Sequence, residues 1–213
     1  MPLPIWSSGP YLAASKRAAQ GIAECERALA LDCNLAEAHA QIGLAKLLMG
    51  RVIETEAHVN EALRLSPRDV FSHRWFMIVG IAKLALKEDA EALSWFDRSV
   101  EANRSHPMVH FLLAVALASL GSLDRACGAT RAGLAITPSF TILRFRDGAQ
   151  SDNPIYLAAC ERLYEGMRSA GVPEGCDVGE GSSTELGLFA SCPVYRPRSR
   201  PLEQTSLFVS FVP

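Results

Sequence analysis

Few residues of this chain have the types and spacing that metal binding or catalysis would require. His106 and His110 lie four residues apart, a spacing that on a helix could bring two imidazoles to one metal ion. His106 precedes Pro107, however, and the residue before a proline is biased away from helical backbone. We therefore expect a turn and a helix start here. The six cysteines form no Cys-x-x-Cys pair and have no zinc-type spacing with the histidines, which favours reduced thiols.

Three further motifs could suggest catalysis or ligand binding, but each has a simpler structural explanation. Ser151-Asp152-Asn153 matches one fragment of the penicillin-binding enzyme signature, but the accompanying Ser-x-x-Lys motif is absent, and a helix cap explains the triplet. The glycine-rich segment 175–183 follows no strand and precedes no helix, so it does not suit phosphate binding. Arg196, Arg198 and Arg200 beside Tyr195 are best interpreted as a solvated charge run. We predict no catalytic residue, metal site or cofactor.

The bulk composition excludes several classes of partner. The chain has 213 residues, of which 49% are hydrophobic and 21% charged, and its net charge is −2. This balance favours a folded chain and gives no electrostatic reason to bind nucleic acid or an anionic membrane. The N-terminus lacks the pattern of a secretion signal, and the longest apolar runs are shorter than the roughly 20 residues of a membrane helix. We expect a cytoplasmic protein.

Similar residues recur at a fixed interval in the sequence, which indicates a repeated structural unit. Ala28-Leu29 recurs as Ala62-Leu63, 34 residues later, and Val100 and Leu134 are separated by the same interval. Within 36–69, apolar residues follow helical spacing on both sides of Gly50, and Pro67 ends the second run. One unit is therefore a pair of antiparallel helices. Neighbouring units must stack to cover the apolar faces that one unit leaves open.

The repeat divides the whole chain into segments. We predict an N-terminal flank with a poorly ordered or damaged first helix, a partial repeat, three full repeats, C-terminal capping helices and a disordered tail rich in Gly, Pro and Ser. A short helix opens the capping region, and the next helix begins at the Ser151–Pro154 start signal. The corresponding ranges are 1–17, 18–35, 36–69, 73–106, 107–140, 141–174 and 175–213. The array as a whole spans 18–140.

These units resemble the tetratricopeptide repeat (TPR) family. The resemblance implies an all-α, right-handed α-solenoid of antiparallel helix pairs, with about three and a half repeats plus a capping helix. Small residues are expected where two helices cross closely, and glycine or proline where a helix ends. In the middle copy Lys87 replaces the turn glycine. The expected packing and stop positions are Gly43, Gly50, Ala62, Pro67, Gly80, Ala92, Ala114, Gly121, Ala126 and Pro138.

The same resemblance implies that the first helix of each pair lines a concave groove. The groove positions that it assigns are apolar apart from one arginine: Ala40, Leu44, Leu47, Leu48, Arg74, Met77, Ile81, Leu84, Met108, Phe111 and Val115. An apolar groove suits an amphipathic helix or another apolar surface. The expected partner is a protein, which includes a second copy of this chain. In the alternative, the chain's own terminal helix or a missing N-terminal portion fills the groove.

A longer succession of segments resembles the C-terminal repeat region of bacterial class III adenylate cyclases. It runs from "EALRLSPRD" through "HFLLAVALASLGSLDRA" to "SDNPIYLAACERLYEGMRSAGVPE" and covers roughly residues 18 to 174. The chain contains no cyclase domain. The two resemblances lead to two alternative functions. The chain is a non-enzymatic module that binds a protein through its groove, or it is a truncated or free-standing regulatory part of a cyclase that has no activity of its own.

Overall fold

The structure, a computed structural model, describes residues 14–175, and within that range it contains nine α-helices and no strand. The predicted all-α, right-handed solenoid of antiparallel helix pairs is confirmed. The helices are α1 (Ala14–Leu31), α2 (Ala36–Leu48), α3 (Val52–Leu65), α4 (Ser72–Ala85), α5 (Asp89–Ala102), α6 (Pro107–Ser119), α7 (Leu123–Ile136), α8 (Ile142–Asp147) and α9 (Pro154–Ser169).

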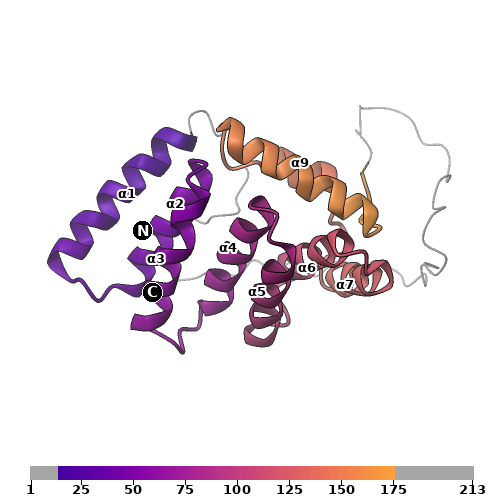
Figure 1. The fold of residues 1–213 in the computed structure, drawn as a ribbon, viewed down its shortest axis with the longest axis horizontal. Helices are drawn as coiled ribbons and strands as arrows, with labels where there is room; N and C mark the ends of the chain where they lie inside the picture. The colour runs from indigo at the N-terminus through magenta and orange to yellow at the C-terminus, as the bar shows by residue number, and fades with distance from the viewer. Residues whose placement is uncertain (1–13, 176–213) are drawn as a thin grey trace, which may run out of the picture. The chain divides into compact units, whose positions relative to one another are not determined.

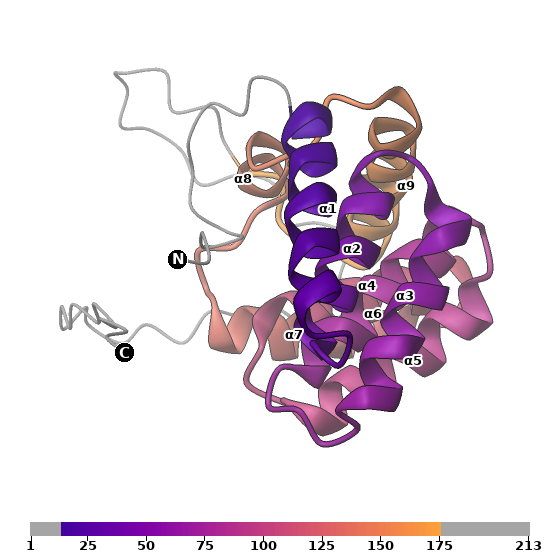
Figure 2. The ribbon, with the colours of Figure 1, turned by 90° about the vertical axis from the view of Figure 1, so that its left-hand side faces the viewer.

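The first seven helices stack in the order of the sequence. Helices α2 and α3, α4 and α5, and α6 and α7 form the three pairs, and each pair packs on the next (Figure 1). Helix α1 packs against α2 at the N-terminal end of the stack (Figure 2). Its buried side chains Ala18 and Ile22 contact Ile42 and Ala45. Residues 1–13 and 176–213, which include most of the predicted flank and tail, lie outside the described residues.

The turn inside each pair requires a left-handed residue. Gly50 and Gly121 have φ of 74° and 76°, a conformation that costs glycine little because it has no Cβ. Lys87, which replaces the glycine in the middle pair, adopts the same conformation with φ of 65°. The middle turn therefore keeps the geometry of the other two at some cost in backbone strain.

Close approach of the paired helices explains the small residues at their crossings. A Cβ added at Gly43 would lie 2.9 Å from Val59 Cγ2, and one added at Gly80 would lie 2.4 Å from the Phe96 ring. In the third pair Ala114 is fully buried. A larger side chain at these crossings would push the two helices apart.

Polar side chains set where the last two helices begin. The Thr141 side chain accepts a hydrogen bond from Arg144 N at the start of α8. The Asn153 side chain accepts from Ile155 N and Tyr156 N at the start of α9. An N-cap residue before Pro154 is the start signal that the sequence indicated.

Candidate binding groove

The eleven predicted groove residues are divided between two environments. Six of them line a cavity: Leu44, Leu47, Leu48, Arg74, Met77 and Ile81. The other five are outside the cavity lining: Ala40, Leu84, Met108, Phe111 and Val115. Four of these five are at most 1% exposed, and Met108 packs against the core. Helices α8 and α9 and the segment before them cover much of the surface that a partner was expected to reach.

The cavity lies between the first two helix pairs and the C-terminal helices. It has a volume of about 80 Å³. Its walls come from α2, from the first residue of α3, from one face of α4, from α8 with the following connection, and from α9. They are formed by Leu44, Leu47, Leu48, Val52, Arg74, Met77, Ile78, Ile81, Ala85, Phe145, Gly148, Ala149, Gln150, Tyr156, Ala159, Cys160, Leu163 and Tyr164. Arg74 is the one charged residue among them.

Two side chains fasten the start of α9 to the end of α2. Ser151 Oγ donates a hydrogen bond of 2.6 Å to Leu48 O, and Asn153 Nδ2 donates one of 3.0 Å to Met49 O. Both acceptors are carbonyl groups at the C-terminal end of α2, where no further helical turn would satisfy them. The residues that cap α9 thus also supply hydrogen bonds to the terminal carbonyl groups of α2, about one hundred residues earlier in the chain.

Arg162 fastens the middle of α9 to the second helix pair. Its Nη1 donates to Leu84 O at 2.7 Å, and its Nη2 donates to both carboxylate oxygens of Asp89 at 2.6 and 2.7 Å. The two side chains are 27% and 16% exposed, so the ion pair is largely shielded from water. A shielded, charge-assisted contact of this kind positions α9 more strongly than a surface ion pair would.

The end of α9 packs on the third pair. A Cβ added at Gly166 would lie 2.6 Å from Val115 Cγ1, so α9 approaches α6 as closely as a glycine allows. Thr130 Oγ1 of α7 donates to Ala170 O at 2.9 Å. These contacts and those described above attach α9 to all three helix pairs.

An aromatic chain fills the groove at its α6 end. The Phe111 ring stacks on Phe140 with centroids 3.9 Å apart, Phe140 lies 6.0 Å from Phe145, and Phe145 contacts Tyr164 edge-on. These residues come from α6, the segment after α7, α8 and α9 in turn. The predicted groove residue Phe111 is therefore covered by side chains of its own chain.

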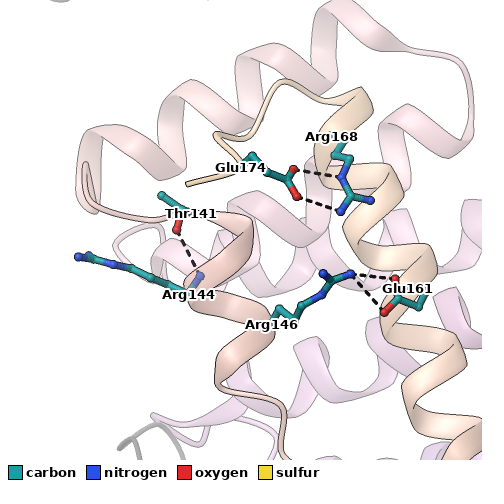
Figure 3. A network of polar contacts seen from close by, with 6 residues as sticks. All are labelled: Thr141, Arg144, Arg146, Glu161, Arg168 and Glu174. Carbon is teal, nitrogen blue, oxygen red and sulfur yellow. Dashed lines mark hydrogen bonds and ion pairs between the residues drawn. The ribbon is translucent and has the colours of Figure 1, made fainter. Parts of the chain in front are cut away.

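Exposed ion pairs connect α8, α9 and the segment that follows (Figure 3). Arg146 of α8 contacts Glu161 of α9, and Arg168 of α9 holds Glu174 through two hydrogen bonds of 3.0 Å. Their side chains are 41–60% exposed, so water screens these pairs. These exposed pairs orient α8 and α9 relative to each other. The buried contacts described above attach the two helices to the array.

The polar groups that line the cavity are neutral except for Arg74. Burial raises the pKa of the Tyr156 and Tyr164 hydroxyls and of the Cys160 thiol, so all three stay protonated at neutral pH. Arg74 Nε is buried and has no hydrogen-bond partner among the described residues. Its guanidinium lies 5.5 Å from the centroid of the Phe71 ring. The cavity is thus apolar apart from the half-buried Arg74, whose Nε lacks a hydrogen-bond acceptor.

The histidines that suggested a metal site do not form one in the part of the chain that the structure describes. His106 is extended, with φ −84° and ψ 108°, and begins α6 as its N-cap residue. His110 Nε2 lies 2.8 Å from Arg104 O. No helix within residues 14–175 is long and apolar enough to cross a membrane.

Sequence reasoning missed the residues that attach α9. Ser151 was interpreted only as part of a cap, and Arg162 was not singled out, because their partners lie 73 to 103 residues away. Tyr164 of α9 is buried, whereas Leu157 of the same helix is 40% exposed. The one available signal was the i, i+4, i+8 spacing of Tyr156, Cys160 and Tyr164, which marks a single helix face.

Comparisons with known proteins identify the fold. MamA superposes with a TM-score of 0.52 at 19% sequence identity over 75% of this chain and 94% of that one. YrrB, a TPR protein with an unusual peptide-binding site, has a TM-score of 0.50 at 22% identity over 73% of this chain and 77% of that one. A second MamA structure, from AMB-1, has a TM-score of 0.51 at 20% identity over 71% and 92%. No protein-family model and no curated protein sequence matches the chain. At these identities the likeness establishes a TPR-type fold.

Proposed function

We propose that the chain is a protein-interaction module whose partner binds the concave face over α2 and α4. Its contact residues are the predicted groove residues that α9 leaves partly uncovered. The observation that carries the proposal is the incompletely filled apolar cavity at that end, where Leu44, Leu48 and Ile81 are only half-buried. A concave apolar surface with few polar groups suits the apolar face of a helix or a short extended segment.

The fold supports the same proposal. Stacked helix pairs present a concave surface, and such surfaces serve as binding faces in repeat proteins. YrrB, whose fold resembles this one, has a peptide-binding site. The absence of an enzymatic activity and a cytoplasmic location remain predictions from the sequence.

Photo-crosslinking tests the proposal directly. A photoreactive amino acid at Leu44 should capture one protein from an extract of the source organism, and the same group at Ile53 should not. Ile53 is 82% exposed on α3 and serves as the matched control. Leu44→Gln with Leu48→Gln should then abolish association with that protein while the helical signal stays unchanged. Equal capture from both positions would contradict the proposal.

The cyclase-derived alternative is not favoured by any contact among the described residues or by any comparison. It stays a prediction that rests on the resemblance alone. A cyclase domain encoded immediately upstream, together with binding of that domain to this chain, would be needed to prefer it. Binding to an unrelated protein through Leu44 would favour the interaction module.

A further inference from the structure

The cavity under α9 has the features of a small-molecule site. Of its 18 lining residues, Arg74 alone carries a charge, and the hydroxyl, thiol and amide groups are few. A buried guanidinium nitrogen that faces an apolar cavity without an acceptor is costly, because the hydrogen bond that it loses to water is not replaced. Arg74 as a whole is half-buried, and its side chain forms no hydrogen bond or ion pair with another described residue. A bound anion would remove this cost.

The residues that line the cavity extend along most of α4. The lining follows one stripe of α4 from Arg74 through Met77, Ile78 and Ile81 to Ala85. Eleven residues of α-helix rise by about 16 Å. The volume of about 80 Å³ holds roughly five to eight water-sized groups. A rigid ring system or a whole helix does not fit inside this volume, whereas a single unbranched chain does.

The charge of the lining restricts the head group. One guanidinium with apolar surroundings matches one carboxylate, which it can hold through two parallel hydrogen bonds. A phosphate or nucleotide would need several donors or cations, and the lining has one. A cation would meet no acidic residue among the 18. A neutral apolar molecule would leave Arg74 Nε without an acceptor.

We propose that this cavity binds an unbranched aliphatic carboxylate of medium chain length, with its carboxylate on Arg74 and its chain between α4 and α9. The inference goes beyond the proposed function, because it requires no protein partner. Ligand in this position would bridge the array and α9, since both contribute to the walls. It would therefore stabilise the folded chain as well as fill the cavity.

Isothermal titration calorimetry of the full chain tests the proposal. Hexanoate, octanoate and decanoate should bind, with affinity rising about fourfold per added methylene until the chain outgrows the cavity. Octan-1-ol should bind about tenfold or more weakly than octanoate, because it cannot pair with the guanidinium. The absence of saturable binding by all three acids would overturn the proposal, as would equal affinity for octanoate and the alcohol.

Three variants locate the site. Arg74→Met should lose the preference for acid over alcohol and, without ligand, melt at the same or a higher temperature than the wild-type chain. Arg98→Met is the control, because that guanidinium stacks on the Phe76 and Trp95 rings and does not line the cavity. Ala159→Leu, which fills the cavity from α9, should weaken binding of acid and alcohol alike.

The outcomes remain distinct from those of the proposed function. Arg74→Met that keeps the wild-type preference for octanoate, or Arg98→Met that loses it, would contradict the assignment of the site. A partner captured at Leu44 without any binding of acids would support the interaction module alone. Binding of octanoate without a captured partner would support the small-molecule site alone.

Discussion

At the scale of single residues, burial gives His106 an unusual titration. Burial, with smaller contributions from the positive charges of His73, Arg74 and His110, lowers the pKa of His106 from 6.5 to about 4. Between those values the unfolded chain binds a proton that the folded chain does not. Folding stability is therefore full above pH 6.5 and falls as the pH drops towards 4.

Urea unfolding of the wild-type chain and His106→Gln, measured from pH 7 to pH 4, checks this prediction. The wild-type midpoint should fall more steeply with decreasing pH, because the variant lacks the histidine. Carboxylates titrate in both proteins, so the difference between the two curves is the informative quantity. Parallel curves would show that His106 is accessible to protons in the folded chain.

Overpacking at a helix crossing provides a second prediction at this scale. Ala126 is fully buried in a small cluster with Ala114, Leu117 and Ala170. Ala126→Leu adds three carbon atoms where α7 crosses α6, so we expect a loss of roughly 1–3 kcal/mol in the free energy of unfolding. A denaturant titration measures it. A midpoint equal to or above that of the wild type would mean that space is available at this crossing.

At the scale of elements, the shielded ion pair between Arg162 and Asp89 contributes to the stability with which α9 is attached to the array. Arg162→Met removes the contacts to Asp89 and Leu84 O and leaves the Asp89 carboxylate, 16% exposed, without its partner. We expect a loss of roughly 1–3 kcal/mol in unfolding free energy, the usual range for losing a hydrogen bond to a charged group. Arg146→Met, which removes the exposed pair with Glu161, should cost about 0–1 kcal/mol.

A double-mutant cycle separates the pair from its surroundings. Adding Asp89→Asn to Arg162→Met should restore part of the lost stability, because the carboxylate no longer lacks a counter-charge. Equal losses for Arg162→Met and Arg146→Met would show that Arg162 does not fasten α9.

At the scale of the whole molecule, the repeat architecture could be predicted from the sequence because it rests on local rules. Gly50 and Gly121 mark turns that require positive φ, and Gly80 and Ala126 mark crossings that admit only small side chains. Equivalent positions recur 37 residues apart between the first and second pairs, as from Gly43 to Gly80, and 34 apart between the second and third, as from Gly80 to Ala114. This recurrence strengthens the prediction of a repeat. Lys87 alone departs from the turn pattern and adopts the same geometry.

The covering of the groove could not be predicted in the same way. It depends on contacts between residues far apart in sequence, such as Arg162 with Asp89 and Ser151 with Leu48 O, and such pairs have no period. The periodic pattern could identify the apolar residues of the groove, because their spacing is helical. It could not distinguish a partner helix from α9, since both would cover the same apolar side chains.

The chain's own C-terminal helices cover most of the predicted groove residues. Met77→Asp with Ile81→Asp tests it, measured as the midpoint of urea unfolding against Ile53→Asp as the exposed control. Met77 is 5% exposed and Ile81 packs against the same core, so the account predicts a much lower midpoint for the double variant and an unchanged one for the control. A double variant as stable as the wild-type chain would contradict the claim, because it would place both side chains in water.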